Sequence, residues 1–166
     1  MKSRLIAAKA HAEARDVKAY REAMQASQSG PYGYVWLLGI RQQDPLRIVK
    51  RVERGLAFQA FERLQRNTKL STSDLAEAVA VSARTLHRRK EQGRLAPDES
   101  DRLVRFSRIF GRVLELFEGN LDSARRWLST PNEALGGERP IALAKTDVGA
   151  REVEALIDRL EQGVLT

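Results

Sequence analysis

The chain has 166 residues, a net charge of +7, 42% hydrophobic residues and no cysteine. This length and apolar content allow one ordinary domain or two small ones around a buried core, and the lack of cysteine excludes disulfide frameworks and thiolate metal sites. Two widely separated histidines, His11 and His87, argue against a zinc site. The N-terminal stretch is charged where a signal peptide would be apolar, and the apolar run PYGYVWLLGI is too short to span a bilayer. We therefore expect a cytoplasmic protein without membrane contact.

Charge is distributed unevenly along the chain. Residues 1–66 hold thirteen Lys and Arg against six Asp and Glu, residues 67–112 ten against six, and residues 113–166 six against ten. A basic region concentrates polyanions such as DNA, whereas an acidic region repels them and suits a protein partner. The sequence therefore indicates different partners for the two ends of the chain.

The first 39 residues are expected to form an N-terminal helical arm. Residues 1–27 are rich in Ala, Lys, Arg and Glu, and beyond Leu5, Ile6 and Val17 they offer little apolar area to bury. We therefore expect this arm to be loosely held or partly disordered. SQSGPYGY interrupts it, and the apolar run from Val35 to Ile40 should dock on the following domain.

From Pro45 onward the apolar spacing is helical, and no run alternates with period two for long enough to predict a strand. Gly55 should separate two short helices, and Ser71 should cap the next, with Asp74 three residues on. Pro97 is expected to open a long helix that extends to about Glu118. The chain therefore reads as all-α.

The C-terminal third shows further capping signals. We expect Asn120 to cap a helix after Gly119, and Thr146 to cap a last helix that Gly163 ends. Thr130, Pro131 and Glu133 resemble a capping box that opens a very short helix, closed by Gly136 and Gly137. The last helix has a stripe that should be plain core: Val153, Leu156, Ile157 and Leu160.

A helix-turn-helix is predicted in LSTSDLAEAVAVSARTLHRRKEQGRL, residues 70–95. Ala76 supplies the small residue at the helix crossing, and Ala80 and Val81 form the turn. The two helices would share a core of Leu75, Val79, Val81 and Leu86. Ala80 stands where glycine is common, and a left-handed alanine costs on the order of 1 kcal/mol.

The second helix of this motif is the candidate DNA-binding element. Arg84 and Thr85 lie near its N-terminus, where side chains reach base edges most readily, while arginines and lysines further on would contact phosphates. The alternative is an amphipathic surface helix whose arginines are merely solvated. The candidates are Ser82, Arg84, Thr85, His87 and Arg88, with Arg89, Lys90 and Arg94 on phosphates.

From about Ile40 onward the chain resembles a known family. The stretches LHRRKEQGRLAPDESDRL, ARRWLSTPNEALGGERPIAL and TDVGAREVEALIDRLEQGV are similar to the Xre/MbcA/ParS antitoxins, particularly those paired with RES-domain toxins. The resemblance covers about three quarters of the chain, and its tail motif WLxxPNxALGG is the most specific part. Residues 1–39 lie outside it. Ala96 replaces a serine common in the family, which implies a weaker helix cap.

The resemblance implies a two-part antitoxin of a type II toxin-antitoxin system. An Xre/Cro-like domain over residues 40–112 would repress its own operon as a homodimer, and residues 113–166 would bind the cognate toxin. RES toxins of such pairs degrade NAD⁺, and similar antitoxins cover the toxin's active-site entrance with their C-terminal region. The chain itself would bind no NAD⁺ and no other cofactor.

The last helix and the tail that follows it are the candidate toxin-binding surface. The polar side of this helix is rich in acidic residues, and an exposed tail could reach into a pocket, although most chain termini are simply frayed. The candidates are Arg151, Glu154, Asp158, Glu161, Val164, Leu165 and Thr166, with Glu152 on the same polar side.

Catalysis is not indicated. The sequence has no glycine-rich phosphate loop, nucleophile elbow or histidine-carboxylate arrangement. Two alternatives to the antitoxin hypothesis remain open at this point. One is a stand-alone dimeric helix-turn-helix regulator, and the other is a toxin-binding protein that has lost DNA binding.

Overall fold

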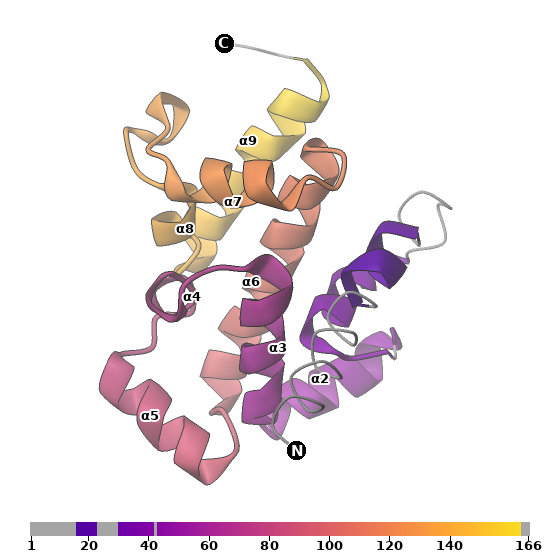
Figure 1. Cartoon of the computed structure of the whole chain (residues 1–166), viewed down its shortest axis with the longest axis vertical. Helices are drawn as coiled ribbons and strands as arrows, with labels where there is room; N and C mark the ends of the chain where they lie inside the picture. Colours follow the sequence, from indigo (N-terminus) through magenta and orange to yellow (C-terminus); the bar gives the residue numbers. More distant parts are fainter. Residues whose placement is uncertain (1–15, 23–29, 42, 164–166) are drawn as a thin grey trace, which may run out of the picture.

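The computed structural model describes residues 16–22, 30–41 and 43–163. Every regular element in these ranges is a helix, which confirms the all-α fold (Figure 1). No helix in the described ranges has the length and apolar character needed to cross a membrane. Residues 16–22 are helical, and the elements after them are η1 (Gly33–Leu38), α2 (Pro45–Glu53), α3 (Phe58–Thr68), α4 (Thr72–Ala78), α5 (Ala83–Gln92), α6 (Pro97–Leu116), α7 (Leu121–Ser129), η2 (Glu133–Leu135), α8 (Pro140–Leu143) and α9 (Asp147–Glu161).

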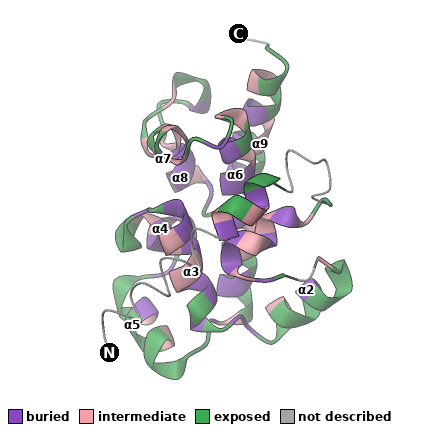
Figure 2. Cartoon of the chain, turned by 45° about the vertical axis from the view of Figure 1, so that its right-hand side comes forward, coloured by how far each residue is buried: buried purple, intermediate pink, exposed green. Residues whose placement is uncertain are grey.

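Helix α6 is the central helix of the fold. In Figure 1 it runs between α2–α5, toward the lower end, and α7–α9, toward the upper end. Phe106, Ile109 and Phe110 of α6 are fully buried, and a single hydrophobic core extends from η1 to α9 around them (Figure 2). The boundary that the sequence suggested after residue 112 therefore falls inside a continuous helix.

Polar contacts also join α4 and the turn after it to α6 and to the segment before α8. Arg139, just before α8, places its guanidinium 2.8 and 3.0 Å from the carboxylate oxygens of Glu77 in α4. The Arg102 Nε of α6 donates to the Val79 carbonyl oxygen at 2.6 Å. These contacts fix the helix-turn-helix relative to the rest of the fold.

Most of the predicted helix caps are confirmed. The Ser71 hydroxyl accepts from the Asp74 amide at 3.0 Å, the Asn120 side chain accepts from Ser123 at 3.0 Å, and Thr146 accepts from Gly149 at 3.0 Å. Pro97 opens α6, although its cap residue Ala96 has no side-chain acceptor.

The predicted capping box at Thr130 is wrong. The short helix is the 3-10 turn η2, and its cap is Asn132, whose Oδ1 accepts from the Ala134 amide at 3.0 Å. Thr130 instead donates its hydroxyl to the Arg126 carbonyl at 2.7 Å, so it ends α7 and does not start the next element. Gly136 and Gly137 do close the turn, with φ of 68° and 81°.

Glycine is required at position 55, where the sequence predicted a break. Its φ is 78°, and a β-carbon there would collide with the Leu95 carbonyl oxygen. The amide of Leu95 donates to the Leu56 carbonyl at 2.9 Å, so two segments about forty positions apart run in close contact. This contact holds the end of α2 next to the end of α5.

The expectation of a loosely held arm is wrong for residues 16–22. Asp16 is fully buried and binds Arg41 and Arg63, each at 2.5 Å, and Tyr20 is buried against α6. The expectation rested on scarce apolar residues, whereas this segment is held by a buried carboxylate and one aromatic ring. Leu5 and Ile6 lie outside the described residues.

Candidate functional site

The predicted helix-turn-helix core is confirmed. Leu75, Val79, Val81 and Leu86 are buried, and Ala76 is 7% exposed at the crossing of α4 and α5. Ala80 adopts the expected left-handed conformation, with φ of 52°. The amide of Val81 donates to the Ala76 carbonyl at 2.9 Å and closes the turn.

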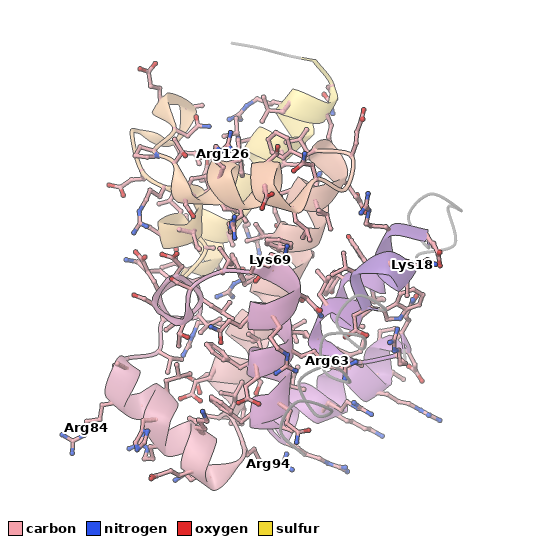
Figure 3. All side chains as sticks on the ribbon, in the orientation of Figure 1. Lys18, Arg63, Lys69, Arg84, Arg94 and Arg126 are labelled. Carbon is pink, nitrogen blue, oxygen red and sulfur yellow. The ribbon has the colours of Figure 1, made fainter. Side chains whose placement is uncertain are left out.

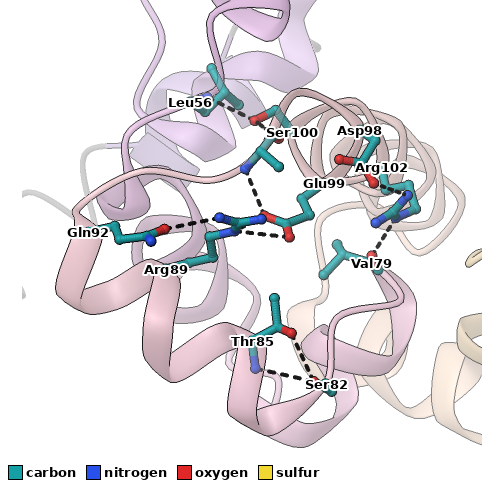
Figure 4. A network of polar contacts seen from close by, with 11 residues as sticks. Leu56, Val79, Ser82, Thr85, Arg89, Gln92, Asp98, Glu99, Ser100 and Arg102 are labelled. Atoms are coloured by element: carbon teal, nitrogen blue, oxygen red, sulfur yellow. Dashed lines mark hydrogen bonds and ion pairs between the residues drawn. The ribbon is translucent and has the colours of Figure 1, made fainter.

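Ser82 starts the second helix of the motif. Its Oγ accepts from the Thr85 amide at 3.1 Å and lies 3.1 Å from the Thr85 hydroxyl (Figure 4). This satisfies one amide at the N-terminus of α5, the end that a recognition helix presents to base edges. Thr85 itself is partly buried, so its hydroxyl serves the cap as well as the surface.

Three cations on α5 are exposed and carry no side-chain partner among the described residues: Arg84, Arg88 and Lys90. Arg84 points away from the body of the protein (Figure 3). His87 is also exposed and lies 3.4 Å from Glu91 on the next turn. The charged groups of Arg84, Arg88 and Lys90 are therefore available to an external anion without the loss of an ion pair among the described residues.

Arg89 is arranged differently. Its Nε lies 2.9 and 3.1 Å from the two carboxylate oxygens of Glu99, and its Nη1 lies 3.0 Å from the Gln92 side chain (Figure 4). The hydrogen bond with Glu99 raises the pKa of Arg89 above its usual value. Glu99 also accepts from the Ala96 amide at 2.7 Å, which is the half of a capping box that does not depend on the side chain at position 96.

Arg94 is also held by the fold. Its Nη1 donates to the Gly55 carbonyl at 2.5 Å and to the Arg54 carbonyl at 3.3 Å. The sequence assigned Arg89 and Arg94 to phosphates, but the structure places both guanidinium groups on intramolecular acceptors. No short-range sequence signal marked these contacts, since Glu99 lies ten positions after Arg89 and Gly55 lies 39 positions before Arg94.

The acidic side of α9 faces α6. Glu154 binds Arg108 of α6 at 2.6 and 3.2 Å, and Arg112 binds Asp158 at 2.5 Å and Glu161 at 3.0 Å. Three of the candidate toxin-binding carboxylates therefore form ion pairs within the chain.

The other candidates on this surface differ in their exposure. Arg151 is 76% exposed and lies 2.9 Å from Asp147, and Glu152 is exposed. Val164, Leu165 and Thr166 lie outside the described residues. Val153, Leu156 and Ile157 are buried, as expected for the core side of α9, and Leu160 is partly buried.

No cluster of three or more metal-ligating side chains is found among the residues that the structure describes. The described residues combine exposed cations on α5 with carboxylates on α9 that pair with arginines of α6.

Comparison with known proteins agrees with this division. Residues 47–108 match the family model of the antitoxin Xre-like helix-turn-helix domain, and residues 112–163 match that of the antitoxin Xre/MbcA/ParS C-terminal toxin-binding domain. The two matched segments meet inside α6.

Curated relatives named Antitoxin Xre match most of the chain. The protein from Yersinia enterocolitica is 33% identical over 120 residues, which are 72% of this chain and 81% of the relative. The one from Photorhabdus laumondii is 30% identical over 113 residues, 68% of this chain and 76% of the relative. The one from Pseudomonas putida is 36% identical over 114 residues, 68% of this chain and 70% of the relative. The chain therefore belongs to the Xre family of antitoxins, in which a helix-turn-helix domain is followed by a toxin-binding domain.

Proposed function

We propose that this protein neutralises a RES-domain toxin that degrades NAD⁺, by binding it over its active site, and represses its own operon as a homodimer. In this proposal the protein acts by binding alone, in the cytoplasm, and performs no catalysis. One observation carries the proposal: α6 joins a helix-turn-helix, whose second helix has cations without a side-chain partner in the described part of the chain, to a segment that matches a toxin-binding domain.

The DNA-binding part of the proposal rests on α5. Arg84 and Arg88 lie four residues apart, on one side of a helix whose opposite side is anchored by Leu86. We assign base contacts to Arg84 and Thr85 and phosphate contacts to Arg88 and Lys90. Arg89 and Arg94 take a positioning role, because they hold α5 against α6 and α2. His87 lies beside the base-contacting residues.

The toxin-binding part rests on the match over residues 112–163 and on the polar side of α9. Arg151, Glu154, Asp158 and Glu161, with the tail Val164 to Thr166, are the proposed contact residues. Because three of these carboxylates are paired with α6, the toxin would meet them with their geometry already fixed, at little cost in side-chain entropy.

Dimerisation follows from the geometry of operator recognition. One helix-turn-helix covers a single half-site, and symmetric proteins read two half-sites about one helical turn apart. The proposed operator is therefore an inverted repeat in the promoter region of the gene.

Co-expression with the product of the neighbouring gene tests the whole proposal. We expect that product to co-purify with this protein, and to deplete cellular NAD⁺ when it is expressed alone. The variant Arg84→Ala with Arg88→Ala should lose the shift of the promoter fragment in a gel yet still protect NAD⁺. Loss of both activities in that variant would contradict the two-part assignment, and an uninhibited neighbouring product would favour a stand-alone regulator.

A further inference from the structure

A second basic surface lies on α2, outside the helix-turn-helix itself. Ile48 is buried and Val52 is partly buried on the inner side of this helix. The exposed side carries four cations at the spacing i, i+3, i+4, i+7, which places them along one face of a helix. We call these residues the α2 stripe: Arg47, Lys50, Arg51 and Arg54.

The fold does not use most of this charge. Arg47 lies 3.5 Å from the helix cap Asp44, but the side chains of Lys50, Arg51 and Arg54 have no partner in the described ranges. The helix dipole favours cations in the last turn, where Lys50 and Arg51 lie, and disfavours Arg47 in the first turn. Like charges at this spacing repel one another. An external anion beside the stripe would relieve this repulsion.

The position of α2 relative to α5 is fixed by backbone contacts. The Phe58 amide, at the start of α3, donates to the Gly93 carbonyl at 2.9 Å, and the Leu95 amide donates to the Leu56 carbonyl at 2.9 Å. Arg94 binds the carbonyls of Arg54 and Gly55 across the same junction. The C-terminal ends of α2 and α5 therefore meet, at the lower end of the molecule where Figure 3 labels Arg94.

The combined length of the two helices suits a duplex. Helix α5 has ten residues and α2 has nine, so at about 1.5 Å per residue they are about 15 and 14 Å long. With the short junction between them, their outer ends are separated by at most a distance on the order of the ~34 Å of one turn of B-DNA. A duplex that receives the N-terminus of α5 in its groove extends far enough to pass the stripe.

We propose that the α2 stripe contacts DNA phosphates beside the groove that α5 enters, and so extends the DNA-binding surface beyond the recognition helix. This inference rests on the proposed DNA-binding function. The stripe contributes affinity and no sequence preference, because phosphates carry no sequence information. Its partner is the sugar-phosphate backbone of double-stranded DNA.

The test is the salt dependence of binding by the variant Lys50→Gln/Arg51→Gln/Arg54→Gln. Binding is measured to the protein's own promoter fragment and to a shuffled duplex of equal length and composition. Each lost phosphate contact lowers the slope of log affinity against log salt by about 0.9. We expect the slope to fall by about 2 to 3 per protomer, and affinity at ~0.1 M salt to fall roughly 10- to 100-fold for both duplexes.

A matched control removes the same charge elsewhere. Arg126→Gln/Lys145→Gln/Arg159→Gln neutralises three cations on α7 and α9 and on the connection between α8 and α9, none with a side-chain partner among the described residues. It should change the slope by less than about 1, since only long-range attraction is lost. Single variants Lys50→Gln and Arg54→Gln, each with a slope change of about 0.9, keep the test valid if the triple variant unfolds.

The outcomes separate this inference from the proposed function. Equal salt slopes for the two triple variants overturn the role of the stripe, even if Arg84→Ala/Arg88→Ala abolishes promoter preference. Loss of toxin binding with unchanged DNA binding overturns it in favour of an acidic protein partner. Retained promoter preference in Arg84→Ala/Arg88→Ala, together with a lowered slope in the α2 variant, supports the stripe and contradicts the role of α5.

Discussion

The phenol of Tyr20 occupies the place where the β-carbon of any other residue at position 111 would lie. Gly111 is in the middle of α6, and a β-carbon built there would collide with the Tyr20 hydroxyl oxygen. Burial, and then the nearby Glu115 carboxylate, raise the pKa of Tyr20, so its hydroxyl stays protonated and donates to Glu115 at 3.3 Å. Glycine inside a helix costs about 1 kcal/mol relative to alanine, and the docking of residues 16–22 is what that glycine permits.

The first prediction is therefore that the effect of Gly111→Ala on the free energy of unfolding changes sign when Tyr20 is removed. Gly111→Ala should displace Tyr20, speed hydrogen exchange in residues 16–22 and lower the free energy of unfolding. In a Tyr20→Ala background the same substitution should stabilise the protein by about 0.5–1 kcal/mol, the gain in helix propensity. The remaining close neighbour, the Tyr34 β-carbon at 3.3 Å, needs to move by only a few tenths of an ångström. Denaturant unfolding of the unmodified protein, the two single variants and the double variant measures the coupling energy between positions 20 and 111. Additive effects on the free energy of unfolding would contradict the contact.

Two substitutions at Ser82 separate the effect of the helix cap on stability from the effect of an added charge on DNA binding. Ser82→Ala removes the acceptor for the Thr85 amide and should cost about 1 kcal/mol, or roughly 2–4 °C in Tm. Ser82→Asp keeps an acceptor, so Tm should stay near that of the unmodified protein. The added negative charge lies at the end of α5 that we propose faces DNA and should weaken promoter binding at least tenfold, or about 1.4 kcal/mol. Unchanged binding by Ser82→Asp would remove this end of α5 from the interface.

Arg88 and Arg89 are neighbours in sequence with opposite expected readouts. Arg88 is exposed and has no side-chain partner in residues 16–22, 30–41 and 43–163, whereas the Arg89 side chain is 21% exposed and bound to Glu99, which is 7% exposed. Arg88→Gln should weaken promoter binding severalfold and lower the salt slope by about 0.9 without a change in Tm. Arg89→Gln should lower Tm, because it leaves the buried Glu99 carboxylate with fewer donors. Thermal scans and salt titrations of both variants check this. A lower salt slope for Arg89→Gln and a lower Tm for Arg88→Gln would instead assign Arg89 to phosphate contact.

The sequence predicted those features that depend on residues a few positions apart. The caps at Ser71, Asn120 and Thr146 each involve a side chain and an amide three positions later. The small residue at Ala76 and the strained turn at Ala80 belong to one short motif, so its core could be named without a structure. The error at Thr130 was also local, because two neighbouring residues could each serve as a cap and only backbone geometry chooses between them.

What the sequence did not predict is long-range pairing of charges. Arg108 and Glu154 are 46 positions apart, and Arg63 and Asp16 are 47 apart. A carboxylate on an amphipathic helix looks the same in sequence whether it faces solvent or an arginine of another helix. For that reason the polar side of α9 appeared free, and Asp16 appeared to belong to an unattached arm.

The paired carboxylates of α9 lead to the last prediction, which separates a structural from a toxin-binding role. Arg112→Gln and Asp158→Asn/Glu161→Gln break the same ion pairs from opposite sides. These side chains are 27%, 54% and 39% exposed, so either change should cost at most about 1 kcal/mol of stability. If the carboxylates contact the toxin, only Asp158→Asn/Glu161→Gln should lose toxin affinity, by about tenfold. Arg112→Gln should keep its affinity, because it leaves the two negative charges in place. Calorimetric titration with the purified toxin measures both affinities, with Tm as the control for folding. Equal losses in the two variants would assign Asp158 and Glu161 to the α6–α9 contact alone and leave toxin recognition to other residues of the C-terminal domain.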